Sequence, residues 1–454
     1  MNVVDVAEQD PAGDSRAVGG DGRQPWNPLA RIAFRFCFAY FLLFCLTAAQ
    51  LVYAFVGVVR QSLPFDAVLF QVRALAPITE WVGRHVFGVD ASFSKNGSGD
   101  QPAIWVTIFM LVVVAAAITL VWTVLDRRRT EYVALGGWFV LVVRMFLGGQ
   151  MLWYGFAKAI PTQMPEPSLT TLLTPVGDLN LLGLLWNQVG ASPVYEVLLG
   201  LAEVLGGVLL FLPRTATAGA LLSVVSLAQV FVLNMTFNVP VKILSFHLML
   251  LSMVVLAPQA RRLADFLVLE RVSEPARQPR LFRSARGNRL AAAAQVVLGI
   301  WVLAGCVGEA RAAWYEIGPG VEKPALYGIW NVTEFDLDGQ PVPALATDET
   351  RWKRLVFDAL ETTYQRMDDT LVPIRAETDA AAHRIVLTEA PQASDAAPTE
   401  LATLTYDRPR PDRLILTGAL GGRPVTVALQ QQDLDRMPLR TDRFHWVQRA
   451  PSDH

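Results

Sequence analysis

The first 310 residues alternate long apolar runs with shorter polar connections. An apolar stretch of about 18 residues is long enough to cross the hydrocarbon core of a bilayer as a helix. We therefore predict a helical membrane bundle of seven transmembrane helices within residues 31–310, after a polar cytoplasmic tail, residues 1–30, that we expect to be disordered. The predicted spans are residues 34–58, 103–125, 134–158, 193–212, 216–236, 241–257 and 290–307.

Beyond Cys306 the pattern changes to short segments in which apolar and polar residues alternate. Period-two alternation punctuated by Gly, Asp and Pro predicts β-strands. Eight or nine such strands in residues 320–454 indicate an all-β barrel or sandwich. The predicted strands are IWNVTEF, RLVFDAL, TTYQRM, LVPIRAE, RIVLTEA, LATLTY, RLILTGA, PVTVALQ and FHWVQ.

The tripeptide GIW at Gly328–Trp330 resembles the Gly-x-Trp that opens lipocalin-type barrels. A barrel of that type holds a ligand, whereas a barrel filled by its own side chains would serve for docking, and the sequence leaves both open. His383 and His445 each stand alone on a predicted strand, so we expect them to be structural or solvated. We predict no metal site, because no second histidine lies at ligand spacing.

Basic residues are distributed unequally between the connections. The 126–132 connection has three arginines, the 258–289 connection has eight and the turn at Arg214 adds one, whereas the 161–192 connection has neither Lys nor Arg. Lys and Arg accumulate in cytoplasmic loops. We therefore predict a cytoplasmic N-terminus, and seven spans then place the β-domain outside the cytoplasm.

Two of the outer connections are long. Residues 65–89 combine apolar residues at helical spacing with a few charges, which predicts a helix lying on the membrane surface. The 161–192 connection contains four prolines followed by LLGLLW. We predict that it folds back as a cap over the outer mouth of the bundle.

The composition agrees with a membrane protein. The chain is 52% hydrophobic with a net charge of −2, which makes the lipid bilayer its expected partner and gives no sign of nucleic acid. Cys37, Cys45 and Cys306 lie in or beside apolar runs without CxxC spacing. We expect reduced, buried thiols.

Charged residues interrupt the third and fourth predicted spans and share a helical face with glycines. Intramembrane charges almost always face the bundle interior and seek partners, and glycine lets two helices approach closely. We therefore predict that these two faces pack together. They are Arg144, Gly148, Met151, Gly155 and Lys158 on the third span, and Glu196, Gly200, Glu203 and Gly207 on the fourth.

Depth along the two helices predicts which charges meet. Counted from their cytoplasmic ends, Arg144 and Glu203 are nearly level at mid-membrane, so we predict an Arg144–Glu203 pair. Lys158 and Glu196 match less well, with a gap of roughly 10 Å. Side chains lean toward the N-terminus of their helix, so the register could slip by a turn.

The next two spans add further polar residues, namely Gln229, Asn234, Lys242 and His247. His247 is also placed at mid-membrane, where its imidazole needs a partner such as Glu203 or Gln229. Tyr154, near the outer end of the third span, either belongs to an aromatic belt or lines a site.

Two interpretations of these residues are open. The first is a proton-handling or ligand-binding cluster with a gate. The cluster consists of Arg144, Glu203 and His247, and the gate consists of Lys158, Glu196 and Lys242. The second is a set of structural ion pairs that fix the order of the helices. The rarity of charge inside membranes favours the first interpretation, and the equal numbers of acids and bases on the two faces favour the second.

Residues 130–260 resemble the DoxX family of small bacterial four-helix membrane proteins. The resemblance rests on RMFLGGQMLWYGFAK, LAEVLGG and NVPVKILSFHLMLLSMVVLAP. It implies a four-helix core in a bacterial cytoplasmic membrane and a link to redox chemistry, because relatives pass electrons to quinone or assemble with thiol-handling enzymes. This chain adds spans on both sides and a β-domain. Its matched core contains no cysteine, so the core itself cannot exchange thiols.

Three functions follow from these features, and the sequence leaves open whether the protein is an enzyme. The first is a binding or scaffold component of a cell-envelope complex, whose partners are other envelope proteins or a hydrophobic small molecule. The second is a redox-linked subunit in which the buried cluster holds a quinone headgroup, the one cofactor that the resemblance suggests. The third is a transporter of a small or proton-coupled solute, against which no internal repeat is visible.

Overall fold

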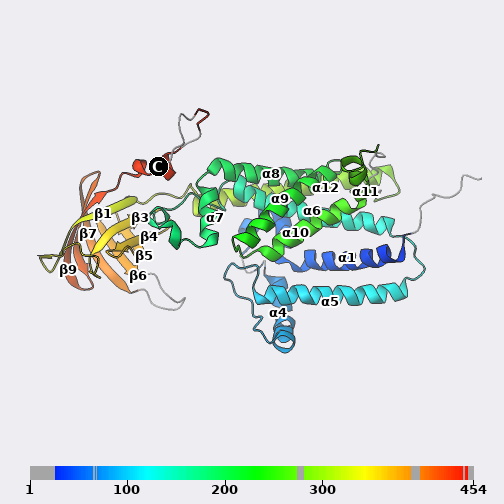
Figure 1. The fold of residues 1–454 in the computed structure, drawn as a ribbon, viewed down its shortest axis with the longest axis horizontal. Helices are drawn as coiled ribbons and strands as arrows, with labels where there is room; N and C mark the ends of the chain where they lie inside the picture. The colour runs from blue at the N-terminus through cyan, green and yellow to red at the C-terminus, as the bar shows by residue number, and fades with distance from the viewer. Residues whose placement is uncertain are drawn as a thin grey trace, which may run out of the picture.

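The computed structural model describes residues 26–64, 67, 69–272, 281–389, 399–442 and 445–447. Within these residues, seven helices are long and apolar enough to cross a membrane, and a closed antiparallel β-barrel follows them. The chain is a multi-pass membrane protein with a C-terminal β-domain, and the predicted fold class is confirmed. The long helices run side by side, with the barrel beyond one end of the bundle (Figure 1).

The helices follow the apolar runs closely. α5 and α8 both begin at a proline, whose fixed φ and missing amide hydrogen suit the first turn of a helix. The helices are α1 (Pro28–Thr47), α2 (Ala49–Tyr53), α4 (Phe70–Val82), α5 (Pro102–Leu125), α6 (Val133–Ala159), α7 (Leu181–Gly190), α8 (Pro193–Phe211), α9 (Ala216–Thr236), α10 (Lys242–Leu256), α11 (Ala260–Leu267) and α12 (Ala285–Glu316).

The first transmembrane helix begins earlier in the chain than we predicted. α1 begins at Pro28, capped by Asn27, whose side-chain oxygen accepts from the Ala30 amide at 2.6 Å. Residues 28–30 of the predicted disordered tail therefore belong to a transmembrane helix, and residues 1–25 lie outside the described residues.

The first predicted span, residues 34–58, is not one straight helix. α1 ends at Thr47 and Ala48 is extended, after which α2 and a 3₁₀ segment, Ala54–Ser62, continue the chain. Gly57 has φ +59° and lies against α12, where Trp301 Nε1 donates to the Phe55 carbonyl at 3.0 Å. Irregular backbone is tolerated at membrane depth when protein groups satisfy it.

The described parts of the arginine-rich connections lie together at the end of the bundle opposite the barrel (Figure 1). The Trp26 amide donates to the Thr130 carbonyl at 3.1 Å, which joins the start of α1 to the 126–132 connection. Pro213, in the α8–α9 turn, and Pro258, beyond α10, line one cavity together with residues from the first half of α6. Connections that the spans assign to one side of the membrane therefore lie on one side of the bundle.

Both of the long connections that we predicted to be on the outer side contain helices. α4 lies within the predicted amphipathic segment and is packed beside α5, with Phe70, Ile78 and Trp81 exposed. The 161–192 connection forms two short 3₁₀ turns and then α7, between the bundle and the barrel (Figure 1). The second arrangement is the one expected of a cap, and we call residues 161–192 the cap from here on.

The β-domain is a single antiparallel barrel. Its strands are β1 (Gly328–Leu337), β2 (Gln340–Pro341), β3 (Trp352–Phe357), β4 (Thr362–Arg366), β5 (Leu371–Asp379), β6 (Arg384–Glu389), β7 (Glu400–Arg410), β8 (Arg413–Leu420) and β9 (Arg423–Gln431). From β3 to β9 each strand pairs with the next, and β1 closes the barrel by pairing with both β3 and β9, while the short β2 pairs with β1. The ninth predicted strand, FHWVQ, is not formed at residues 445–447, and Phe444 and Gln448 lie outside the described residues.

The barrel interior is filled by side chains. A continuous cluster of buried residues includes Trp330, Phe335 and Trp352, and Trp330 is fully buried with its Nε1 donating to the Leu326 carbonyl at 2.8 Å. Gly328 has φ +144°, and a Cβ atom there would lie 2.4 Å from Gln431 Nε2, which explains the glycine of the GIW motif. The packing favours the filled barrel over the ligand-holding one.

The barrel contacts the cap directly. The Leu169 amide donates to Asp358 Oδ2 at 2.6 Å, and Thr170 Oγ1 donates to Thr363 Oγ1 at 3.1 Å. Leu169 is fully buried in a small cluster with Ile329 and other apolar residues of the barrel. The barrel therefore holds the cap in place by both apolar and polar contacts.

Candidate functional site

The centre of the candidate site is an ion pair between α6 and α8. Lys158 Nζ donates to Glu203 Oε2 at 2.8 Å, and less than a tenth of either side chain is exposed. The two inward charged faces do meet, as their spacing predicts. The predicted Arg144–Glu203 pair is wrong, because Glu203 has a different cationic partner.

The register between α6 and α8 explains the change of partner. A Cβ atom on Gly155 would lie 2.7 Å from the Val204 nitrogen, and one on Gly200 would lie 2.2 Å from the Ala159 nitrogen. Glu203 is therefore level with Gly155, which is 11 residues beyond Arg144, about 16 Å along the helix. The prediction assumed that both helices end at the same depth, but α6 has 27 residues and α8 only 19.

A cavity of about 150 Å³ lies beside the ion pair, enclosed by α6, α8, α9, α10 and the cap. Leucine, valine, methionine and tryptophan side chains form most of its walls. The cap supplies Met164, Leu185, Trp186 and Val189, so it closes the cavity on the barrel side. The polar residues of the wall are Gln150, Tyr154, Lys158, Gln163, Glu203, Ser226, Gln229, Asn234 and Ser245.

Gln150 presents an unsatisfied acceptor in this wall. Its side chain is fully buried, and its Nε2 donates to the Gln50 carbonyl at 2.9 Å. That backbone acceptor fixes the orientation of the amide, since only the nitrogen can donate to it. Gln150 Oε1 is buried without a hydrogen-bond partner. A buried oxygen of this kind costs free energy unless a donor is supplied.

Tyr154 lies in the cavity wall and completes the surroundings of the lysine. Its hydroxyl accepts a hydrogen bond from Gln50 Nε2 at 2.6 Å, and its ring lies 5.5 Å from Lys158 Nζ. The ammonium also lies 3.4 Å from the Tyr154 carbonyl. Tyr154 is therefore a site residue as well as an aromatic residue near the outer end of its span.

Glu196 anchors the cap and has no cationic partner among the described ion pairs. It is almost fully buried in the first turn of α8, where a negative charge is favoured by the helix dipole. Its Oε1 accepts from the Met164 amide at 3.0 Å. In addition, Trp186 Nε1 donates to the Gln163 carbonyl at 3.0 Å. These bonds hold the cap against the cavity.

The other predicted site residues occupy different positions around the cavity. Asn234 is buried in the wall and donates to Ser245 Oγ at 3.0 Å. Gln229 also lines the cavity but is exposed, so it stands at the cavity's edge on the outer surface of α9. Lys242 does not line the cavity and lies 3.5 Å from Asp100 in a partly exposed ion pair.

His247 lies outside the candidate site, between α10 and α1. Its Nε2 lies 2.6 Å from the Tyr40 hydroxyl, its Nδ1 lies 2.7 Å from the Ile243 carbonyl, and its ring stacks on Phe44. The expectation that Glu203 or Gln229 partners His247 is wrong. The contact between α1 and α10 could not be predicted, because it joins two helices that are about 200 residues apart in the chain.

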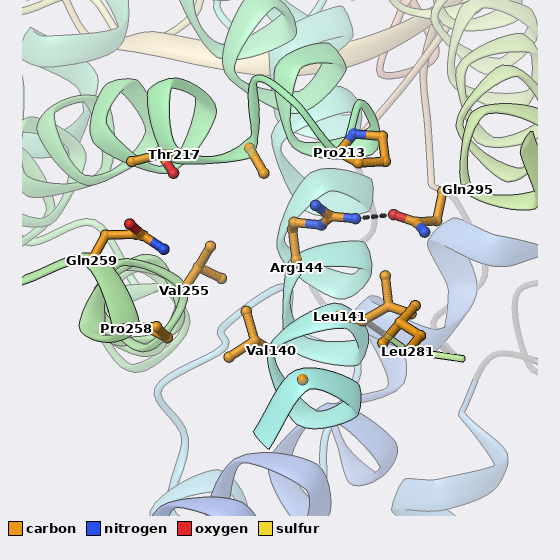
Figure 2. Close-up of a pocket in the computed structure, with 12 residues that line it drawn as sticks. Val140, Leu141, Arg144, Pro213, Thr217, Val255, Pro258, Gln259, Leu281 and Gln295 are labelled. Carbon is orange, nitrogen blue, oxygen red and sulfur yellow. Dashed lines mark hydrogen bonds between the residues drawn. The ribbon is translucent and has the colours of Figure 1, made fainter. Parts of the chain in front are cut away.

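Arg144 is the twelfth of the 27 residues of α6 and lies in a separate cavity of about 110 Å³ (Figure 2). Its guanidinium donates to Gln295 Oε1 of α12 and lies beside Pro213, in the turn that ends α8 (Figure 2). Arg144 is therefore level with the α8–α9 turn and well separated from Glu203. The predicted Arg144–Glu203–His247 cluster is divided among three places in the bundle.

The sequence-based prediction missed Gln50, Gln150, Gln163, Ser226 and Ser245. Gln150 stands inside the same polar-interrupted span as Arg144 and Lys158, so the rarity of polar residues in membrane helices could have identified it. Gln50 and Gln163 lie outside the four-helix core and carried no such signal. Cys37, Cys45 and Cys306 are free thiols, as expected, and Cys45 and Cys306 are buried, whereas Cys37 is only partly buried.

The fold and the site define a helical membrane protein with a capped internal cavity and a C-terminal β-barrel. Part of the chain is 31% identical over 119 residues to the uncharacterized protein YwoB of Bacillus subtilis (strain 168), a match that covers 26% of this chain and 75% of that protein. The chain belongs to the same family as this relative. No protein-family model and no solved structure matches the chain.

Proposed function

We propose that the protein is a membrane-embedded binding component of the bacterial cell envelope, with a DoxX-like core that holds a single-ring molecule bearing a hydroxyl group. One observation carries the proposal. Gln150 Oε1 is a fully buried acceptor without a partner in the wall of an otherwise mostly apolar cavity. A bound hydroxyl would supply the missing donor.

The cavity volume sets the size of the ligand. A dry protein cavity of about 150 Å³ lined by apolar side chains binds benzene, and the cavity here has about this volume. One ring with small substituents therefore fits. A larger molecule fits only if its remainder leaves the cavity, and the exposed position of Gln229 marks an edge where this is possible.

The polar groups of the cavity set the chemistry of the ligand. Lys158 has three donors, of which one serves Glu203 and one points to the Tyr154 carbonyl. A third donor serves an oxygen of the ligand. The site thus offers a donor at Lys158 together with unpartnered acceptors at Gln150 Oε1 and Gln163 Oε1, which suits a phenol or a quinol better than a plain hydrocarbon.

The second candidate function is a redox-linked subunit that binds a quinol. The pairing of a donor group with an acceptor group in one ring-sized cavity favours it, because a quinol has a hydroxyl at each end of its ring. In that case both hydroxyls contribute to binding. A monophenol then binds more weakly than the corresponding hydroquinone.

The arrangement in the membrane follows from the gathered arginines. The arginine-rich connections lie at the end opposite the barrel, and such connections are cytoplasmic in bacterial membranes. We therefore place the barrel and the cap on the periplasmic side. There the filled barrel serves as a docking surface for another envelope protein, and it holds the cap closed over the cavity.

Binding of two matched probes to the purified full-length chain tests the proposal. The probes are 2,3,5,6-tetramethylphenol and 1,2,4,5-tetramethylbenzene, which differ only in the hydroxyl group. A buried acceptor left unpaired costs about 1–3 kcal/mol, so we expect the phenol to bind roughly 5- to 150-fold more tightly, measured by calorimetry in detergent. Tetramethylhydroquinone, kept reduced under nitrogen, distinguishes the two candidate functions. If the second function holds, it binds at least about tenfold more tightly than the phenol.

Two variants show whether the probes occupy this cavity. Ser226→Leu adds side-chain volume to the cavity wall and should abolish binding of the phenol. Val225→Leu changes the neighbouring residue, which is two-thirds exposed on the outer surface of α9, and should leave binding unchanged. Equal affinity for the two probes, or full binding by Ser226→Leu, would contradict the proposal.

A further inference from the structure

The second cavity, around Arg144, has a different character from the first. It lies at the end of the bundle opposite the barrel, level with the α8–α9 turn (Figure 2). Among the described residues its lining is apolar except for Arg144, Thr217, Gln259 and Gln295, with no aspartate or glutamate. The charge that the described residues place in its wall is therefore positive.

The positive charge of Arg144 is not compensated by the described part of the chain. Only 8% of the residue is exposed, and its one hydrogen bond among the described residues goes to the neutral amide of Gln295. Arg144 Nε is buried without a partner. A buried cation is stable only when it is paired, so an anion from outside the chain is expected at this position.

The same cavity is lined by the N-terminus of a long helix. Ala216 and Thr217, the first residues of α9, are in its wall, and α9 continues for 21 residues. No side chain caps this end, because the Thr215 hydroxyl donates to the Leu209 carbonyl at 3.0 Å instead. Uncapped amide groups and the helix dipole make such an end favourable for an anion.

We propose that Arg144 and the first turn of α9 bind a phosphate group. Arginine and a helix N-terminus are both common partners of phosphate, and together they surround this cavity from two sides. Gln295 is a positioning residue that holds the guanidinium in place through its side-chain oxygen. This site is independent of the capped cavity near Lys158 and does not rest on the function proposed for it.

The headgroup of an anionic phospholipid is the source that the surroundings favour. The α8–α9 turn carries the exposed Arg214, and an arginine near the end of a membrane helix extends its charge to the headgroup region. Val140, Leu141 and Leu281 form the apolar part of the wall, which suits the glycerol and upper acyl region of a lipid. Free inorganic phosphate shares the same chemistry and is the other source to be tested.

The test compares lipids retained by the purified full-length protein in nanodiscs that contain equal amounts of phosphatidylglycerol and phosphatidylcholine. Native mass spectrometry should show phosphatidylglycerol retained about fivefold or more over phosphatidylcholine. The preference should disappear in Arg144→Gln and persist in Arg214→Gln, which removes an exposed arginine from the same turn. An equal preference in wild type and Arg144→Gln would overturn the proposal.

Thr217→Asp keeps the test decisive if Arg144→Gln does not fold. This variant places a carboxylate in the first turn of α9 and inside the cavity, where it supplies the missing anion to Arg144. We expect it to fold, to have a higher melting temperature than wild type in lipid-free detergent, and to lose the phosphatidylglycerol preference. A lower melting temperature together with an unchanged preference would refute the site.

A third arm identifies the source of the phosphate. Inorganic phosphate is titrated into the detergent-solubilised protein, with sulfate-free chloride buffer of equal ionic strength as the control. A rise in melting temperature that Arg144→Gln lacks, without any lipid preference, assigns the site to free phosphate. No response to either phosphatidylglycerol or inorganic phosphate would refute phosphate binding at Arg144.

Discussion

The Lys158–Glu203 ion pair allows a quantitative test of the candidate site. Both side chains are more than nine-tenths buried, and their nitrogen–oxygen distance is 2.8 Å. Removing one partner leaves the other as an uncompensated buried charge, which costs about 3–5 kcal/mol, whereas replacing both with apolar residues is often nearly neutral. The matched set is Lys158→Met, Glu203→Met and the double variant.

We expect each single variant to lower the free energy of unfolding by about 3 kcal/mol or more, and the double variant to recover most of that loss. The assay is unfolding of the full-length protein by sodium dodecyl sulfate in mixed micelles, followed by far-ultraviolet circular dichroism. The interaction free energy is the difference between the double variant and the sum of the two single variants.

The control is the Arg423–Asp338 pair of the barrel. Its side chains are about half exposed, and its nitrogen–oxygen distance is 2.6 Å. Asp338→Asn should change the free energy of unfolding by less than about 1 kcal/mol, because water screens an exposed pair. The buried pair does not form if the single variants at Lys158 and Glu203 lower the free energy of unfolding no more than this control does, and if their two effects are additive.

Three further predictions concern the surrounding structure. Tyr40→Phe should lower the free energy of unfolding by about 1–3 kcal/mol, because it leaves the buried imidazole of His247 without one partner, and a loss under 0.5 kcal/mol would argue against that contact. Asp358→Ala should speed hydrogen exchange at the Leu169 amide by about tenfold or more, measured by mass spectrometry, and unchanged exchange would show that the barrel does not hold the cap. Trp330→Ala should destabilise the barrel by about 3–5 kcal/mol in thermal unfolding, whereas a ligand-holding, loosely filled barrel would tolerate it.

The apolar pattern predicted most helices closely, because length and hydrophobicity alone decide which segments cross a membrane. α5 begins at Pro102 and ends at Leu125, within one residue of its prediction. The break at Ala48 could not be predicted in the same way. It falls inside one continuous apolar run, and the close approach of Gly57 to α12 further along that run is a tertiary contact that leaves no signal in local hydrophobicity.

The sequence identified inward-facing charges correctly but paired them incorrectly. The glycine-rich faces of α6 and α8 do pack together, as the spacing of Gly155 and Gly200 indicates. Which charges pair depends on how far α6 extends beyond α8. The depth at which each helix ends cannot be predicted from the sequence. Because of this offset, Glu203 pairs with Lys158, and Arg144 lies in a separate cavity toward the end of the bundle opposite the barrel.

An experimental structure of the full-length protein bound to 2,3,5,6-tetramethylphenol tests the central claim most directly. The account predicts one aromatic ring in the cavity beneath the cap, with its hydroxyl within hydrogen-bonding distance of Gln150 Oε1 and with Lys158 and Glu203 still paired. A ring bound elsewhere, or a cavity filled by rearranged side chains while the probe remains unbound, would contradict it.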